Sequence, residues 1–306
     1  MKLVTYKENS LTHVGLLTAD DKKIIPVTEA EKTLLGTALI PDTMIGLLNG
    51  GEQMISLLQE LQEKFVANPS RTLELEAVQL LAPIPRPSKN IFCVGVNYRE
   101  HLSEVEDVLD NPNIPKFPVV FSKAPTTVIG PHTMVKRYAN IVSQLDYEVE
   151  LAVIIGKKGS EIKKEVAYDH VFGYTIINDI SARDLQFRHG QWFLGKSCDT
   201  FAPMGPWIVH KSKISNPQEL EIECRINGEL RQLNNTKNMI FDIPTIIETI
   251  SSVITLEPGD IIATGTPSGV GLGFNPPKFL QSGDIMELRI EKIGVLTNIV
   301  EEKESS

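Results

Sequence analysis

Two glutamates one residue apart, Glu148 and Glu150, stand at the start of the apolar run 149–155. Side chains two residues apart on a β-strand project from the same face. Two carboxylates held this close repel one another, and burying them is costly unless a cation lies between them. The hard divalent cations Mg²⁺ and Ca²⁺ take oxygen ligands and meet this need. Asp179, at the end of another β-branched run, could add a third oxygen from a neighbouring strand, so the pattern predicts a carboxylate metal site rather than a zinc site.

The residues around the pair decide whether it is buried. A Glu-x-Glu pair on a strand is more often part of a solvated polar face. Here the strand is apolar at odd and at even positions: Val149, Leu151, Val153 and Ile155 on one face, and Ala152 and Ile154 on the other. A strand that is apolar on both faces is buried on both sides. On these residues alone, a metal site and a solvated pair both stay open.

Composition bounds the class of protein. The chain has 306 residues, 42% of them hydrophobic and 23% charged, which is ordinary for a globular protein. A formal net charge of -9 argues against nucleic acid as the main partner. Three widely spaced cysteines without a CxxC pair indicate neither a disulfide framework nor a zinc knuckle. The absence of a secretory signal and of any membrane-spanning apolar run predicts a cytoplasmic protein without membrane insertion.

The elements that position the acidic residues fall into two predicted domains. Residues 1–87 read as a small N-terminal domain, with three short β-runs followed by helical spacing over 45–66 that is broken at Gly50 and Gly51. The proline-rich stretch 82–90 is the predicted linker. Residues 88–306 form the second domain, in which strand-like runs alternate with long loops.

Two local features of the second domain are also predicted. The charged segment 99–116 begins with a helical pattern and is expected to serve as a binding loop or lid. The dipeptide Asn227-Gly228 predicts a β-hairpin, because both residues accept the positive φ of a tight turn.

Six segments in order resemble the fumarylacetoacetate hydrolase family, and more narrowly its acylpyruvase and oxaloacetate decarboxylase branch: GVNYREHLSEVE, LDYEVELAVIIGK, NDISARDLQ, GKSCDTFAPMGP, NGELRQ and IIATGTPSGVG. The resemblance extends over about residues 90–295. It implies a β-rich α+β fold, in which mixed sheets form a roll or sandwich in the catalytic domain and a small α+β domain precedes it. It also implies a homodimer.

The resemblance assigns the metal site and its neighbours. Glu148, Glu150 and Asp179 match the family's metal ligands, which imply Mg²⁺ as the cofactor, with Mn²⁺ or Ca²⁺ as possible substitutes. Lys196 matches the lysine that places positive charge beside the oxygen of a developing enolate. Alone, Lys196 would read as a surface lysine, but its neighbours are apolar or small.

His101 and Glu104 match a catalytic His–Glu dyad of the family. Three residues apart on a short helix, they fall on one face, so the carboxylate can raise the basicity of the imidazole. Without the resemblance, His101 would more often be a surface histidine. The dyad also lies on the predicted lid, so substrate binding could order it.

Four further residues are expected to bind the substrate: Arg183, Gln186, Thr266 and Lys123. Thr266 falls on a glycine-flanked loop that could present backbone N–H groups to a carboxylate. The sequence GTPSGVGLG has no following GK[ST], so it is not a phosphate-binding P-loop.

The predicted function is metal-dependent C–C bond cleavage of a small 2-oxo acid. Oxaloacetate decarboxylation to pyruvate and CO₂, through an enolate that the ion stabilises, is the favoured reaction. The alternatives are hydrolysis of an acylpyruvate of the fumarylpyruvate type, and isomerisation or decarboxylation of a dienoate from aromatic catabolism. A non-catalytic scaffold with the same fold is the fourth possibility. The sequence does not choose among these chemistries, because the residues of the distal pocket cannot be placed without coordinates.

Overall fold

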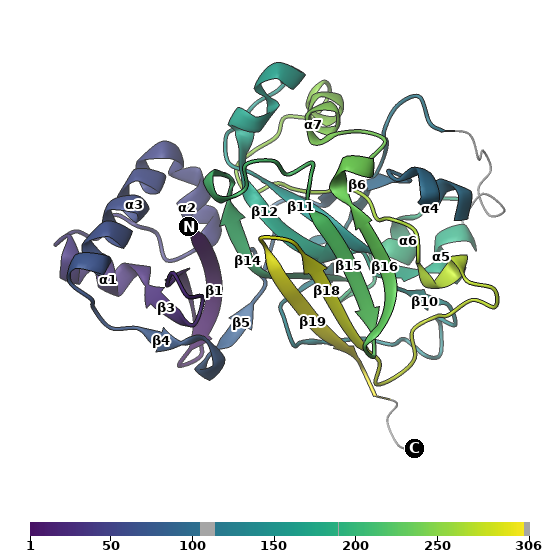
Figure 1. The fold of residues 1–306 in the computed structure, drawn as a ribbon, viewed down its shortest axis with the longest axis horizontal. Coiled ribbons are helices and arrows are strands. Elements are labelled where there is room, and N and C mark those ends of the chain that lie inside the picture. Colours follow the sequence, from purple (N-terminus) through teal and green to yellow (C-terminus); the bar gives the residue numbers. More distant parts are fainter. Residues whose placement is uncertain (105–113, 189, 303–306) are drawn as a thin grey trace.

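A large mixed sheet organises the structure, a computed structural model that describes residues 1–104, 114–188 and 190–302 (Figure 1). The N-terminal part supplies β1 (Lys2–Glu8), β2 (Leu11–Leu17), β3 (Lys23–Pro26), β4 (Leu73–Glu74) and β5 (Gln79–Leu81). The remainder comes from β6 (Ile91–Gly95), β7 (Val119–Lys123), β8 (Val128–Ile129), β11 (Val149–Ile155), β12 (Val171–Asn178), β14 (Ala202–His210) and β17 (Ile261–Ala263). The order is β4-β3-β2-β1-β14-β12-β11-β17-β6-β7, with β5 beside β1 and β8 beside β14.

A second sheet packs against the first. Its order is β16 (Glu229–Asn235), β15 (Glu221–Ile226), β18 (Ile285–Ile290), β19 (Gly294–Val300) and β9 (Met134–Val135). The predicted hairpin joins β15 to β16, with φ of 51° at Asn227 and 79° at Gly228, so this prediction is confirmed. A small separate pair joins β10 (Leu145–Asp146) to β13 (Ser181–Ala182).

Strand β11 is buried on both faces, as its sequence predicts. Its odd-numbered side chains, from Val149 to Ile155, lie in a core shared with Ile222 and Leu288 of the second sheet. Its even-numbered Ala152 and Ile154 lie in a different core. Two packed sheets with helices at the periphery make this a β-rich α+β fold, which confirms the predicted class.

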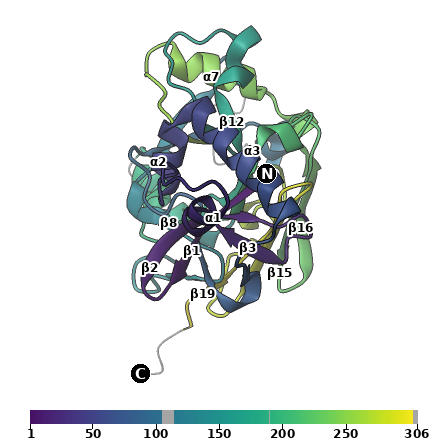
Figure 2. The ribbon, with the colours of Figure 1, turned by 90° about the vertical axis from the view of Figure 1, so that its left-hand side faces the viewer.

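The helices gather in three places. The N-terminal part carries α1 (Val27–Leu34), α2 (Met44–Asn49) and α3 (Gly51–Ala67), which lie together at one end of the molecule in Figure 1 and face the viewer in Figure 2. The predicted break between α2 and α3 is present, with Gly51 at φ 55°. Helices α4 (Arg99–Glu104), α5 (Arg183–Arg188) and α6 (Phe193–Lys196) surround the acidic residues, and α7 (Ile243–Ser251) lies apart. No helix in the described ranges is long and apolar enough to cross a membrane.

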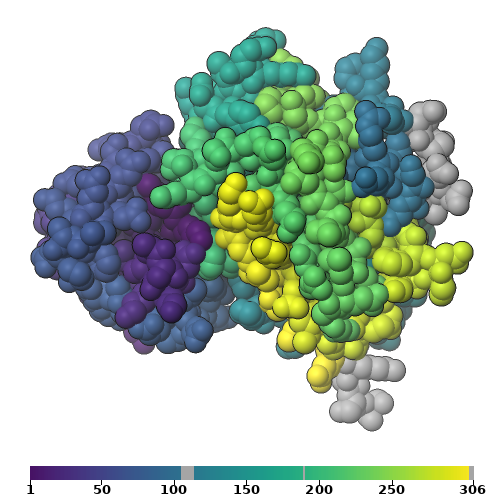
Figure 3. Space-filling view, in the orientation of Figure 1, coloured from purple at the N-terminus to yellow at the C-terminus, as the bar shows by residue number. Residues whose placement is uncertain are grey.

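The N-terminal part is joined to the rest of the protein through a common sheet and a common core. Strand β1 pairs with β14, with Lys2 opposite Val209 and Leu3 opposite Ile208. The core that takes Ala152 and Ile154 also contains N-terminal side chains such as Leu3. In Figure 3 this part forms one end of a continuous body. The division into domains of residues 1–87 and 88–306 stays a prediction.

A buried carboxylate holds the turn after α1. Glu31 is fully buried and accepts hydrogen bonds from Leu39 N at 2.6 Å, Ile40 N at 2.9 Å and Thr37 Oγ1 at 2.7 Å. Burial alone would raise the pKa of Glu31, but these hydrogen bonds outweigh it and lower the pKa below its ordinary value of 4.5. The ionised form therefore stabilises the folded state.

Replacing Glu31 by glutamine is expected to lower the free energy of unfolding by about 1–3 kcal/mol near neutral pH, because charge-assisted hydrogen bonds are lost. The folded-state pKa is depressed, so the wild-type advantage is complete above pH 4.5 and is lost as pH falls through the folded-state pKa. Urea unfolding at neutral and acidic pH measures this, with the exposed Glu52→Gln as the matched control. If Glu31→Gln lowered the free energy of unfolding equally at acidic and at neutral pH, the depressed pKa of Glu31 would be contradicted.

Candidate active site

The predicted site residues meet at one edge of the main sheet, where β6, β12 and β17 end and β11 begins. Strand β11 runs antiparallel to β12 and β17, so its first residues lie beside the last residues of those strands. The Asp179 backbone N–H donates to the Glu148 carbonyl at 2.9 Å. On the other side, Gly265 N donates to Glu150 Oε2 at 2.8 Å. This register brings three carboxylates together.

Glu148, Glu150 and Asp179 each offer a carboxylate oxygen within 4.8 Å of the others, and all three are buried. Burial first, and then the charges of Asp179 and Glu148, raise the pKa of Glu150 well above its ordinary value. No ion pair of Glu150 is found in the part of the chain that the structure describes. Three clustered carboxylates, of which Glu150 forms no ion pair among the described residues, are suitable ligands for a hard divalent ion.

Lys196 bridges two of the carboxylates. Its Nζ lies 2.8 Å from Glu148 Oε2 and 2.8 Å from Asp179 Oδ2. Burial would lower the pKa of Lys196, but the two carboxylates outweigh it and raise the pKa, so the ammonium stays charged. A Cβ on Gly195 would lie 2.4 Å from the backbone nitrogen of Gln186. Glycine therefore lets α6 approach α5 closely enough for Lys196 to reach the site.

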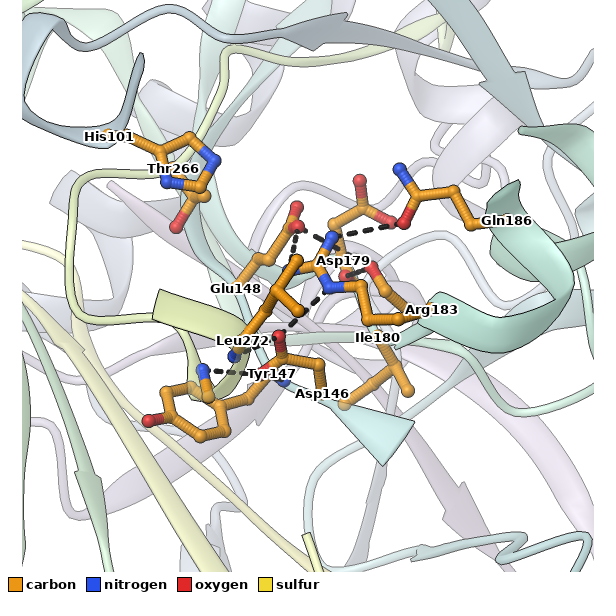
Figure 4. A network of polar contacts seen from close by, with 12 residues as sticks. His101, Asp146, Tyr147, Glu148, Asp179, Ile180, Arg183, Gln186, Thr266 and Leu272 are labelled. Atoms are coloured by element: carbon orange, nitrogen blue, oxygen red, sulfur yellow. Dashed lines mark hydrogen bonds and ion pairs between the residues drawn. The ribbon is translucent and has the colours of Figure 1, made fainter. Parts of the chain in front are cut away.

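Arg183, the first residue of α5, braces Glu148 from the other side (Figure 4). Its Nε donates to Asp146 Oδ2 at 2.9 Å, its Nη2 pairs with Glu148 Oε1 at 2.7 Å, and its Nη1 donates to Gln186 Oε1 at 3.0 Å. Burial would raise the pKa of Glu148, but Lys196 and Arg183 lower it to about 2.

Asp146 is a site residue that the sequence analysis missed. It is completely buried and bonded to Arg183. The signal was present, because Asp146 precedes Glu148 by two residues and so continues the alternation that singled out Glu148 and Glu150.

Lys123 is bonded to Asp179 and does not line the pocket of the site. On β7, its Nζ bonds to Asp179 Oδ1 and to the carbonyl oxygen of Ile180, the latter at 3.0 Å, and the side chain is fully buried. This placement favours support of Asp179 over direct contact with a substrate. The predicted substrate-binding role of Lys123 stays a prediction.

The dyad residues are in contact. His101 Nδ1 lies 3.0 Å from Glu104 Oε2 on α4. Buried Asn97, which belongs to a motif of the resemblance but was given no role, fixes the start of this helix: its amide donates to the Thr264 carbonyl at 2.7 Å and its Oδ1 accepts from Phe241 N at 2.7 Å. Residues 105–113 of the predicted lid lie outside the described residues.

Thr266 lies on the loop after β17. Its hydroxyl donates to the Val149 carbonyl at 3.0 Å and accepts from Gln232 Nε2 at 2.8 Å. Gln232 Oε1 in turn accepts from Val149 N at 3.1 Å, so this buried amide ties the loop to β11.

A pocket of about 440 Å³, part of it open to solvent, gives access to the site. Polar groups on its wall come from the predicted residues His101, Glu148, Glu150, Arg183, Gln186, Lys196 and Thr266. Its apolar wall includes Phe121 and Trp192, whose rings pack edge to face at 5.3 Å. Val96, also on the wall, has a φ of 54°, which a β-branched residue rarely adopts. Its size and mixed lining suit a small organic acid.

Comparisons with known proteins identify the family of the chain. Residues 90–301 match the sequence model of the family described as fumarylacetoacetate (FAA) hydrolase C-terminal. The chain is 52% identical over 303 residues to the oxaloacetate tautomerase YisK of Bacillus subtilis, covering 97% of this chain and 99% of that protein. It is 41% identical over 309 residues to the mitochondrial oxaloacetate tautomerase FAHD2B of Bos taurus, covering 98% and 91% of the two chains.

A solved structure has the same overall arrangement. The fumarylacetoacetate hydrolase of the psychrophile Exiguobacterium antarcticum superposes with a TM-score of 0.82 at 38% sequence identity. The match covers 99% of this chain and 100% of that one, so the N-terminal part is included.

Proposed function

The chain belongs to the fumarylacetoacetate hydrolase family, and we propose that it is a divalent-metal-dependent enzyme that interconverts the enol and keto forms of oxaloacetate. One observation carries the proposal: Glu148 and Glu150 of the buried triad line the same pocket as His101, and Lys196 is bonded to Glu148 and to the third member, Asp179. The names of the tautomerases at 52% and 41% identity support oxaloacetate as the substrate.

The triad would hold the ion, which we propose to be Mg²⁺, with Mn²⁺ or Ca²⁺ as possible substitutes. When bound, the ion polarises the 2-oxo group of the substrate and lowers the energy of negative charge on its oxygen. The Lys196 ammonium is charged and directed at the same carboxylates, so it adds to that stabilisation. Arg183 and Gln186, which line the same pocket, would orient the acid groups of the substrate.

His101 is the group proposed to move a proton. Tautomerisation breaks the enol O–H bond and forms a C–H bond at C3, with no change in the carbon skeleton. The imidazole takes the proton from the enol oxygen and delivers a proton to C3, so one group that reaches both atoms is sufficient. His101 lines the pocket, and Glu104 fixes its orientation.

Decarboxylation of oxaloacetate is the second candidate, favoured by the ammonium of Lys196 beside the triad. Loss of the C4 carboxylate as CO₂ leaves negative charge on the same oxygen, and protonation at C3 then gives pyruvate. The two reactions therefore need the same stabilised charge and differ in whether a C–C bond breaks.

Incubation with freshly dissolved enol oxaloacetate separates the two reactions. We expect the ultraviolet absorbance of the enol to decay many-fold faster with enzyme and Mg²⁺ than without enzyme, and EDTA to remove the acceleration. Pyruvate, assayed separately, should accumulate no faster than in buffer. Rapid pyruvate formation would replace tautomerisation by decarboxylation, and no acceleration of either process would refute the proposal.

The remaining parts of the proposal come from the resemblance and the sequence. A homodimer is proposed from the family resemblance, and light scattering after gel filtration tests it. A cytoplasmic location is proposed from the sequence alone, and fractionation of cells that express the untagged protein tests it.

A further inference from the structure

The glycine-rich loop 269–273 touches the dyad directly. Gly269 N donates to Glu104 Oε1 at 2.8 Å, while the other oxygen of Glu104 contacts His101. A Cβ on Gly273 would lie 2.0 Å from Glu104 Oε1 and 2.1 Å from its Cδ. The carboxylate of Glu104 therefore occupies the space that any side chain at position 273 would need.

The same loop is fastened to the segment that carries the first metal ligand (Figure 4). Asp146 Oδ1 accepts from Gly271 N at 2.6 Å, and its Oδ2 accepts from Leu272 N at 3.0 Å. The Tyr147 hydroxyl donates to the Gly269 carbonyl at 2.9 Å. Glu148 follows immediately, so two loop anchors and one ligand are consecutive residues.

We propose that loop 269–273 positions Glu104, and through it His101, relative to the metal ligands, and that Asp146 and Tyr147 are the positioning residues that hold this loop. The inference rests on the proposed function, in which His101 acts on a substrate held at the triad. Asp146 and Tyr147 touch no reacting atom in this scheme.

The contacts of Glu104 give the arrangement its physical reason. One carboxylate oxygen contacts His101 within α4, whereas the other is bonded to Gly269 and packs against Gly273. Proton transfer requires the imidazole within hydrogen-bond reach of the substrate, so Glu104 needs a firm support. The loop supplies one by a backbone hydrogen bond and by close contact.

Gly273→Ala tests the contact with little other disturbance. The backbone of Gly273 is outside the left-handed region, and the three nearest atoms to an added methyl all belong to Glu104. We expect kcat to fall about 10–100-fold, part of what a general acid–base group contributes. KM and the affinity for Mg²⁺ should change less than about threefold, because the triad and Arg183 are untouched.

A double-mutant cycle supplies the control. In a Glu104→Ala background the methyl has room, so Gly273→Ala should cause no further loss of kcat. An equal loss in both backgrounds, or a fall in Mg²⁺ affinity, would overturn the proposal. Tyr147→Phe removes the hydroxyl that donates to the Gly269 carbonyl and accepts from Arg231 Nη1 at 3.4 Å, and it should lower kcat with the same unchanged KM.

A spectroscopic readout keeps the inference separate from the identity of the substrate. The ring nitrogens of the 6 histidines are observed by NMR of histidine-labelled protein, and the His101 signal is assigned with His101→Asn. In Gly273→Ala and in Tyr147→Phe this signal should move toward its position in Glu104→Ala, and the other histidines should not move. A stationary His101 signal overturns the positioning role, whereas a wild type inactive on oxaloacetate overturns only the proposed function.

Discussion

Replacing Glu150 by glutamine is expected to abolish divalent-metal binding and activity without destabilising the metal-free protein. Glu150 is the triad member without an ion pair among the described residues, and burial and its carboxylate neighbours raise its pKa. A neutral amide relieves that repulsion, can still accept from Gly265 N, and can donate to a neighbouring carboxylate. The same change removes one of three charged ligands, so kcat/KM should fall by at least about 10³-fold.

Glu148→Gln is the matched control, because the same substitution there leaves Lys196 and Arg183 facing a neutral group. It should also lose the metal, but it should destabilise the metal-free protein by about 3–5 kcal/mol. Calorimetric titration with Mg²⁺ and thermal unfolding with and without EDTA measure both effects. At 100 times the dissociation constant, Mg²⁺ should stabilise the wild type by about 2.7 kcal/mol and neither variant. Retained Mg²⁺ binding by Glu150→Gln would contradict the site, and equal instability of the two variants would contradict the charge argument.

Lys196→Met is expected to separate stability from catalysis. Removing the ammonium takes one of two cationic partners from Glu148, which keeps Arg183, and one of two from Asp179, which keeps Lys123. The metal-free protein should therefore lose up to about 3–5 kcal/mol. Saturating Mg²⁺ should restore most of this stability, because the ion replaces the missing positive charge between the carboxylates. It should not restore kcat, which we expect to stay about 10²–10³-fold below wild type, since Lys196 stabilises charge that develops on the substrate.

Lys123→Met distinguishes this effect from a general loss of buried charge. Lys123 bonds to Asp179 but is enclosed behind it. Its loss should weaken Mg²⁺ binding through Asp179, and saturating Mg²⁺ should recover most of kcat. Melting curves and kcat across an Mg²⁺ series compare the two lysines. If both variants recovered kcat to the same extent, Lys196 would have no catalytic role beyond holding the carboxylates.

Residue patterns predicted the part of the site that lies within single strands. The alternation of side chains along residues 148–155 predicted that the two glutamates share a face. The apolar residues at odd and even positions predicted that β11 is buried on both sides. Asp179 was placed on a neighbouring strand because its apolar run resembles that of β11. The helix break at Gly51 and the hairpin at Asn227 follow from backbone preferences that are equally local.

Contacts between distant segments could not be predicted, because they depend on the register of strands and on packing. Nothing near Gly273 indicates that Glu104 fills the space above it. The support that Asp146 gives to Arg183 and to loop 269–273 is equally invisible in the residues alone. The dyad and the lysines were predicted from the family resemblance, whereas the residues that they contact are known only from the structure.

The pairing of β1 with β14 has a consequence for synthesis of the chain. Lys2 and Leu3 leave the ribosome before their partners Val209 and Ile208, which lie more than 200 residues further along the chain. Until those partners emerge, the nascent β1 segment displays apolar side chains and an incompletely paired strand edge, which are features that chaperones bind and that promote aggregation. Pairing two strands that are so far apart in the sequence is also intrinsically slow. Strand β14 and its neighbours in the sheet therefore form before β1 can pair with them.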